Sequence, residues 1–482
     1  MIMNNIHKLT KREVYFGIIL SIVIKVAILS FIIQEHKKID SEKFSSFVYI
    51  TNDYNYFLKP VDNLFESGKF SYDGETIFAG RLPGYWFPYL IIHSFFNKEV
   101  SIVFLITLQI LLSILASILF SKLVYFFSKL KTFFYLSIII YSSNLLLIPF
   151  EYMTMTESFS ASSFIIGFYF FYRFYLKNSI KILLISGIFL GWMVFLRPFL
   201  IGFFLIPIFQ ILTTKKYFNL IFFLLPILIA EFSWISRNYI TKNEFIPLRT
   251  SNYVSYGKIY SKSWLSIRKL INAWGEDSAY FEENSLAHWF RRKDHRTENQ
   301  VIPKSALKNV NYEISDIVKL KSLYQNFIKN NQMKCDSELD LLIKKKSDNM
   351  HDNFKKNNFF KYHLNKWYRL KYMFFKSGSS YLSIMKNNKL TYSIIKGFGL
   401  IYYLCFLILG VMYLFKGVLK KENKFYIFLL SAILIFILIF VYYAPVLESR
   451  YFIVPFISLI FCSLVNFKNI NVHLIKKNFN NL

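Results

Sequence analysis

The feature that most constrains this chain is a series of long apolar blocks separated by short basic loops. Leu, Ile and Phe recur within the blocks, and few charged residues interrupt them; 54% of the 482 residues are apolar. Blocks of about 18 or more apolar residues match the hydrocarbon thickness of a bilayer. The pattern therefore predicts an all-α polytopic membrane protein, a bundle of about 10–12 transmembrane helices.

Apolar runs that predict membrane spans occur ten times along the chain. The predicted spans are 14–34, 100–120, 132–150, 158–175, 180–196, 199–213, 217–235, 393–415, 425–444 and 451–467. The apolar stretch 84–96 is short, so it predicts an interfacial or re-entrant helix, with a true span as the alternative.

The short basic loops fix the expected orientation. If the N-terminus is cytoplasmic, alternate threading puts every short Lys-rich or Arg-rich loop, and the basic C-terminal tail, on the cytoplasmic face, as the positive-inside rule requires. We therefore expect an inner (plasma) membrane protein with both termini in the cytoplasm. The formal charge of +29 does not predict nucleic-acid binding, because the Lys and Arg residues sit in loops that contact lipid headgroups.

This threading divides the chain into three parts. Residues 1–240 form an N-terminal transmembrane module whose first outside loop is 35–99. Residues 241–390 are too long for a simple loop and predict a mostly helical extracytoplasmic domain. Residues 391–482 hold the C-terminal transmembrane helices and the basic cytoplasmic tail.

Three carboxylates fall at the extracytoplasmic ends of the predicted spans: Asp53, Glu157 and Glu448. A carboxylate at such a position can accept a proton from a hydroxyl, or bind a divalent cation. A solvated loop acid is the alternative for Asp53, and a helix-capping acid is the alternative for Glu157.

Four arginines fall at the same level: Arg81, Arg197, Arg237 and Arg450. A guanidinium can bind phosphate oxygens with two parallel hydrogen bonds, although an arginine near a membrane also extends toward headgroups. Charged groups at a membrane boundary need partners or a polar cavity. We therefore expect these seven residues to converge on one extracytoplasmic pocket.

The motifs, in this order, resemble those of the GT-C superfamily of integral-membrane glycosyltransferases, in particular the protein O-mannosyltransferase and aminoarabinose-transferase-like group. The landmarks are Asp53, Arg81-x-Pro83-Gly84-Tyr85, Thr156-Glu157, Leu196-Arg197-Pro198, Trp234-x-x-Arg237-Asn238 and Glu448-x-Arg450-Tyr451. They extend over most of the chain, from about residue 50 to residue 455.

The resemblance implies a GT-C-like bundle that transfers a sugar from a polyprenyl-phosphate donor to an extracytoplasmic glycan, lipid or protein acceptor. It implies that Asp53 and Glu157 are the catalytic carboxylates and that the four arginines bind the donor phosphate. The supporting residues would be Tyr54, Pro83, Gly84, Tyr85, Trp234, Asn238 and Glu448. The resemblance implies no certain cofactor and leaves a divalent metal ion open. That ion would bind Asp53 and Glu157, but Asn52 stands where many relatives have a second acid.

Two other functions are compatible with a bundle of this kind. A lipid-linked glycan polymerase or ligase would share the basic loops, but the acid in the first outside loop favours the transferase. A lipid-linked sugar transporter or flippase would carry ionisable residues near the bilayer midplane and paired, broken helices. Here the charges lie at helix ends on one face.

Overall fold

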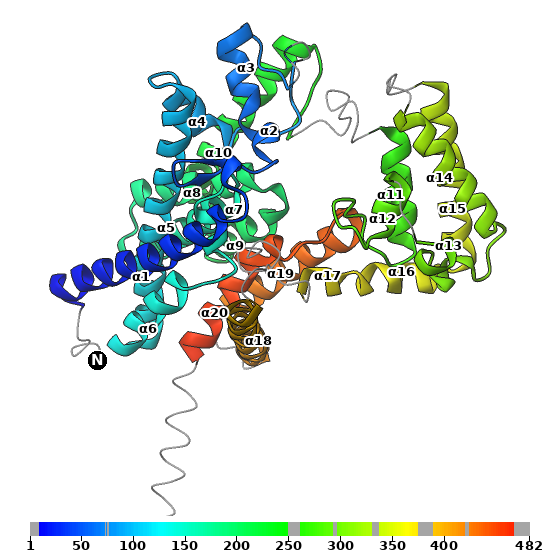
Figure 1. Cartoon of the computed structure of the whole chain (residues 1–482). Helices are drawn as coiled ribbons and strands as arrows, with labels where there is room; N and C mark the ends of the chain where they lie inside the picture. Colours follow the sequence, from blue (N-terminus) through cyan, green and yellow to red (C-terminus); the bar gives the residue numbers. More distant parts are fainter. Residues whose placement is uncertain are drawn as a thin grey trace, which may run out of the picture.

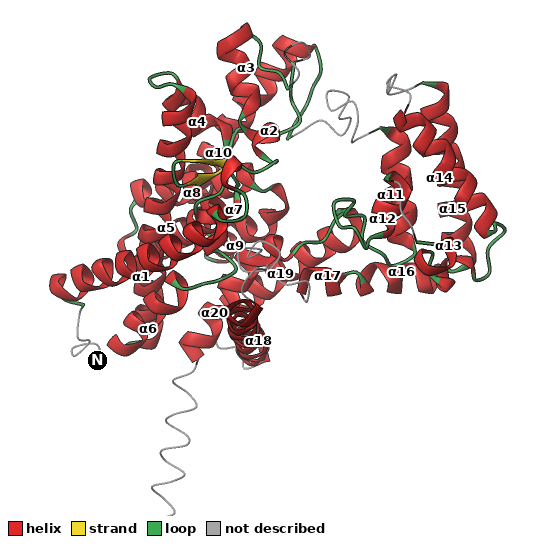
Figure 2. Ribbon diagram, viewed as in Figure 1, coloured by secondary structure: helices red, strands yellow, loops and turns green. Residues whose placement is uncertain are grey.

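The computed structural model describes residues 9–72, 74, 77–248, 261–292, 296–329, 337–374, 389–419 and 424–466. Within these residues the chain is almost entirely helical, and its two strands form one short hairpin (Figures 1 and 2). The predicted cytoplasmic tail falls largely on residues 467–482, outside the described part of the chain.

Ten helices of the described residues form the main bundle. They are α1 (Lys11–Lys37), α5 (Lys98–Ser128), α6 (Lys131–Ser142), α7 (Glu157–Lys177), α8 (Ile180–Leu196), α9 (Ile201–Thr213), α10 (Tyr217–Lys242), α18 (Lys389–Leu419), α19 (Lys424–Tyr443) and α20 (Ile453–Asn466). Six segments within the described residues are long and apolar enough to cross a membrane, in α1, α5, α10, α18, α19 and the segment Ser449–Asn466. An all-α, multi-pass membrane architecture is therefore present.

The predicted span 132–150 is wrong in its second half. Helix α6 ends at Ser142, and the Asn144 side chain accepts a hydrogen bond from the backbone of Leu146 in a local turn. The chain then continues as irregular backbone and a 3₁₀ turn (Ile148–Glu151) to the start of α7. Residues 151–167 are all buried, so the connection that precedes α7 is enclosed by protein. Irregular backbone is tolerated at membrane depth only when protein or a water-filled cavity surrounds it.

The predicted outside loop 35–99 folds as a compact cap. It holds a 3₁₀ turn (Ser41–Lys43), the hairpin β1 (Phe44–Ser45) and β2 (Val48–Tyr49), and the helices α2 (Tyr54–Phe57), α3 (Lys59–Ser67) and α4 (Trp86–His93). Helix α4 occupies the apolar stretch 84–96. Its eight residues extend about 12 Å, too short to cross a bilayer.

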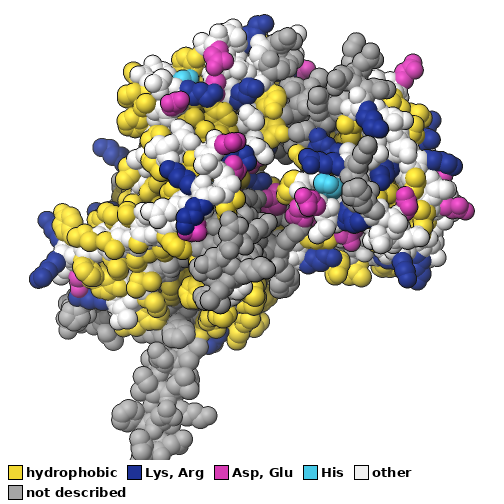
Figure 3. Space-filling model, viewed as in Figure 1, with side chains coloured by type: hydrophobic (Ala, Val, Ile, Leu, Met, Phe, Trp, Pro, Cys, Tyr) yellow, Lys and Arg dark blue, Asp and Glu magenta, His cyan; other side chains and the backbone are white. Residues whose placement is uncertain are grey.

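The insert between α10 and α18 is a helical domain with its own core. Its helices are α11 (Lys262–Ala273), α12 (Leu286–Arg291), α13 (Glu298–Val301), α14 (Ile314–Lys329), α15 (Glu338–Asn357), α16 (Phe359–Tyr368) and α17 (Leu370–Phe374). Trp264, Trp289 and Tyr324 are buried at its centre. In Figure 3, charged side chains are scattered over this domain, whereas hydrophobic side chains cover much of the bundle surface.

Two pairs of predicted cytoplasmic segments lie together in the structure. Lys131 at the start of α6 bonds Glu13 at the start of α1 at 2.6 Å, and Lys216 donates to Asn178 at 3.2 Å. These contacts join turns that the basic-loop threading puts on one face. The opposite ends of α7, α8 and α10 lie at or near Glu157, Arg197 and Arg237.

Candidate functional site

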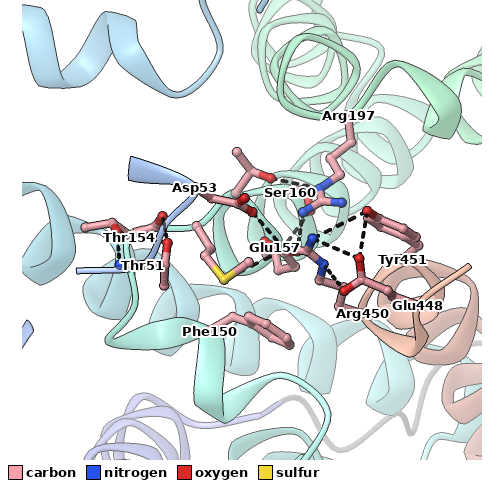
Figure 4. Close-up of polar contacts among 12 residues, drawn as sticks. Thr51, Asp53, Phe150, Thr154, Glu157, Ser160, Arg197, Glu448, Arg450 and Tyr451 are labelled. Carbon is pink, nitrogen blue, oxygen red and sulfur yellow. Dashed lines mark hydrogen bonds and ion pairs between the residues drawn. The ribbon is translucent and has the colours of Figure 1, made fainter. Parts of the chain in front are cut away.

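Backbone pairing between the first loop and the segment before α7 positions Asp53. Tyr49 of β2 donates to the Tyr152 carbonyl at 3.0 Å, and its own carbonyl accepts from Thr154 at 3.2 Å. The Thr51 backbone N–H then donates to the Thr154 hydroxyl at 3.0 Å, and the Thr51 hydroxyl donates to the Thr154 carbonyl at 3.1 Å. This pairing brings Asp53, two residues further on, beside the N-terminus of α7 (Figure 4).

Arg450 connects Asp53 to the two other carboxylates. Its Nη1 lies 2.9 Å from Asp53 Oδ2 and 3.4 Å from Glu157 Oε1, and its Nε lies 2.8 Å from Glu448 Oε2. Asp53 and Arg450 are 397 residues apart in the sequence. The first loop and the segment before α20 therefore meet in one charged cluster.

Glu157 is shared by two arginines. It forms ion pairs with Arg197 and Arg450, and the Arg197 Nε donates to the Thr156 hydroxyl at 2.8 Å. Although Thr156 precedes α7, its side chain makes no capping hydrogen bond. Arg197 also lies over the Tyr451 ring, 5.1 Å from its centre. The carboxylate of Glu157 thus holds guanidiniums from two separate motifs.

Exposure separates the three carboxylates. The Asp53 side chain keeps 28% of its surface exposed, against 11% for Glu448 and 1% for Glu157. Burial would raise the pKa of the Asp53 carboxyl, but Arg450, and then Arg81 and Arg197, hold that pKa below its usual value. Asp53 is therefore ionised at neutral pH and is the most accessible acid of the cluster.

The Arg81-x-Pro83-Gly84-Tyr85 motif packs against the end of α8. A Cβ on Gly84 would come within 2.6 Å of the Leu196 backbone nitrogen, so only glycine permits this close backbone approach. Trp192 donates to the Gly84 carbonyl at 2.6 Å. Arg81 stacks on Phe57, 5.0 Å from the ring centre.

Tyr85 lies on the buried side of the same turn. Burial, and then the neighbouring Glu157, raise the pKa of its hydroxyl well above the usual value. Tyr85 therefore stays protonated next to the cluster.

Arg237 lies apart from this cluster. Its Nη1 donates to the Phe78 carbonyl and to Asn238 Oδ1, both at 2.8 Å, and the guanidinium stacks on Trp234 at 5.3 Å. It lines a separate cavity of about 330 Å³ that also borders α4 through Trp86. Trp234 and Asn238 donate to the carbonyls of residues 248 and 246, so this motif joins α10 to the cap and to the chain beyond it.

Comparison with protein-family models, with curated proteins and with solved structures found no match to this chain. The chemistry of the cluster itself is therefore the basis for a functional proposal.

The inserted domain holds the segment that leads into Glu448 and Arg450. Arg369 donates to the Ala444 and Pro445 carbonyls at 3.1 and 2.9 Å, and it pairs with Asp277 at 3.5 Å. Asp277 in turn accepts from the Leu447 backbone at 3.2 Å. We call Arg369 and Asp277 the clamp, because they tie the domain to the 444–447 segment.

The residues do not fit a divalent metal ion at the expected position. Arg450 Nη1 lies between Asp53 and Glu157, at the place where a shared cation would bind, and Arg197 adds a second positive charge to Glu157. Among the described residues, no group of three or more His, Cys, Asp or Glu side chains could hold a metal. The two guanidiniums, rather than a metal ion, therefore compensate the carboxylates of the cluster.

The structure contains two charge clusters that were not predicted from the sequence. Lys25, midway along α1, pairs with Glu151 at 2.5 Å, and Ser113 also bonds Glu151 at 2.6 Å. Lys25 and Glu151 are buried, with side chains 1% and 0% exposed. Lys25 lies inside an apolar block, and a charge there requires a partner, so the sequence could have predicted a buried ion pair.

The second cluster lies inside the cap. Asp62 accepts hydrogen bonds from Tyr54 and, at 2.8 Å, from Tyr89, and it pairs with Lys98 at 3.0 Å. Asp62 therefore joins α3 to α2, α4 and α5, and Tyr54 bonds Asp62 rather than the Asp53 cluster.

Proposed function

We propose that this chain transfers a sugar from a polyprenyl-phosphate donor to an acceptor on the extracytoplasmic side of the membrane, with inversion at the anomeric carbon. One observation carries the proposal: Arg450 forms ion pairs with Asp53, Glu157 and Glu448. This arrangement pairs an accessible carboxylate with arginines where the cap meets the membrane bundle. It supplies both groups that the reaction needs, a base and a cationic phosphate site.

Donor binding would change the partner of Arg450. The phosphodiester monoanion of the donor competes with Asp53 for the guanidinium, and Arg81 is the second cation whose field reaches Asp53. Once Arg450 turns to the phosphate, Asp53 loses the main interaction that lowers its pKa. The carboxylate then becomes a better base when, and only when, the donor is in place.

The chemical step balances without another reactant. The acceptor hydroxyl oxygen forms a bond to the anomeric carbon while the bond from that carbon to the phosphate oxygen breaks. The hydroxyl proton passes to Asp53, and the bonding electrons leave with the polyprenyl phosphate. Arg450 and Arg81 stabilise the charge that develops on the leaving phosphate. Glu157, which is buried between Arg197 and Arg450, acts by holding these arginines in position.

Glycoconjugates from a strain that lacks the gene provide the test. We expect a species carrying one additional sugar to disappear in that strain, to return with the wild-type gene and to stay absent with Asp53→Asn. Asp40→Asn is a matched control, because Asp40 is 27% exposed, lies in the same loop and pairs with Lys43 at 2.7 Å. Mass spectrometry that finds wild-type glycans in the Asp53→Asn strain would contradict the proposal.

The same experiment separates the alternatives. Loss of a polymerase or ligase would change the length distribution of a glycan or abolish its transfer as a block. Loss of a flippase would leave the lipid-linked donor on the cytoplasmic side. Loss of the proposed transferase leaves the acceptor one sugar short.

A further inference from the structure

Helix α16 of the inserted domain exposes an unusually apolar face. Phe360 is 88% exposed, Leu364 68% and Tyr368 60%, and the exposed Trp367 extends the same face. The spacing of these residues puts them along one side of the helix. An exposed apolar patch on a folded domain marks an interaction surface.

The other side of α16 is packed within the domain. Tyr362 is buried in the domain core, and Asn365 donates to the Ala273 carbonyl at 2.9 Å. Arg369, immediately after the helix, is buried in the clamp. The helix is therefore held firmly with its apolar face turned outward.

The position of α16 is set by the end of a membrane span. His363 Nδ1 lies 3.3 Å from the Tyr442 hydroxyl, and Lys366 lies over the Tyr442 ring at 5.1 Å. Tyr442 and the 84% exposed Tyr443 end the candidate span Phe425–Tyr443. Figure 1 shows α17 and α16 leading away from this end of α19 along the base of the domain.

A stripe of exposed side chains on α19 ends beside α16. Leu434 and Leu438 are 46% and 43% exposed, and with Tyr442 they form this stripe. Aromatic residues at the end of a span, with lysines next to them, are typical of the boundary between acyl chains and headgroups. Lys366 and Lys371 flank the face, and Lys371 lies 3.8 Å from the Tyr368 ring centre.

We propose that α16 lies in the membrane surface, with its apolar face among the acyl chains and its lysines at the lipid phosphates. The partner is the lipid of the leaflet at the Tyr443 end of α19, which the basic-loop threading makes the outer leaflet. This contact fixes the height of the inserted domain above the bilayer. Because the clamp residue Arg369 directly follows α16, it also fixes the segment that leads to Glu448 and Arg450.

Spin labels on the full-length protein in phosphatidylcholine–phosphatidylglycerol nanodiscs test this contact. Single cysteines are placed at Phe360 and Leu364 after Cys335, Cys405 and Cys462 are replaced by alanine. The control label is at Leu342, which is 44% exposed and lies about 22 Å along α15 from its end beside α16.

We expect the ratio of oxygen to nickel-chelate collisions at Phe360 and Leu364 to be several-fold higher than at Leu342. Equal ratios at the three positions would mean that α16 faces water, and would overturn the proposal. Protection of Phe360 and Leu364 from both reagents would mean that protein covers the face, and would overturn it too.

A second measurement needs no cysteine. Lipid brominated near the headgroup should quench wild-type fluorescence more than that of Trp367→Phe, because only the wild type has an indole on this face. Equal quenching in the two proteins would contradict lipid contact. Neither result depends on sugar transfer, so this proposal and the proposed function can fail separately.

Discussion

Replacing Glu157 by glutamine should destabilise the protein strongly. The Glu157 side chain is 1% exposed, and it pairs with both Arg197 and Arg450. Glutamine keeps the shape but removes the charge that compensates two guanidiniums in a poorly hydrated site. Breaking a buried ion pair by removing one partner costs about 3–5 kcal/mol, which corresponds to a fall of roughly 5 °C in the unfolding midpoint.

The measurement is thermal unfolding of the purified protein in nanodiscs, followed by tryptophan fluorescence. Glu35→Gln is the control, because Glu35 pairs with Lys38 at the surface, where their side chains are 23% and 67% exposed. Exposed pairs of this kind contribute at most about 1 kcal/mol. If the Glu157→Gln midpoint equals that of Glu35→Gln, the charge of Glu157 does not hold the arginines and the reasoning is refuted.

Four further outcomes follow from the same structure. Gly84→Ala should lower the unfolding midpoint and sugar transfer together, because a Cβ would meet the backbone of α8 at 2.6 Å; an unchanged midpoint would contradict this packing. Lys25→Met should destabilise by about 3–5 kcal/mol, and adding Glu151→Gln should recover most of that loss, since the double change leaves no unpaired charge; a double variant no more stable than Lys25→Met would contradict the pairing. Arg369→Met should reduce sugar transfer more than it reduces the unfolding midpoint of the bundle, because it releases the 444–447 segment; full transfer would show that the clamp positions nothing. The Asp53 pKa is lowered in the folded state, so its contribution to stability is present above the unfolded pKa of about 3.9 and is lost as the pH falls through the lower folded pKa. The difference in midpoint between wild type and Asp53→Asn should thus stay constant from about pH 8 to about pH 5, and a difference that shrinks across that range would contradict the lowered pKa.

Most of the bundle could be predicted from hydropathy alone. Helix α8 has the predicted bounds 180–196, and the helices predicted from residues 14, 158, 217 and 425 all form. These segments are apolar over a full span, and in a bilayer only a helix satisfies their backbone hydrogen bonds.

Hydropathy could not predict that helix α6 ends at Ser142. Leu145, Leu146, Leu147 and Ile148 keep the window apolar, so hydropathy continues the helix through them. The turn depends on the Asn144 side chain and on protein packed around residues 151–167, and both are properties of the fold.

The convergence of Asp53, Glu157, Arg197 and Arg450 was expected from their common level at helix ends. A shared position along the membrane normal does not determine which side chains are in contact. Arg237 was therefore expected in the same pocket, whereas it lines another cavity. The rotation of each helix about its axis decides this, and it depends on packing such as that of Gly84 against Leu196.

The inserted domain was predicted only as mostly helical. Its role beside the site rests on contacts between residues far apart in sequence, such as Asp277 with Leu447. Short-range patterns carry no information on such pairings.

The most direct test of the proposed transferase is release of polyprenyl phosphate from purified protein in nanodiscs, with a panel of polyprenyl-phosphate hexoses and pentoses as donors. The wild type and Asp40→Asn should release polyprenyl phosphate from at least one donor in the presence of membrane extract as the source of acceptor. Asp53→Asn should release it about 10²–10⁴-fold more slowly, the usual contribution of a positioned general base. Release at the wild-type rate by Asp53→Asn would contradict the assignment of Asp53 as the base.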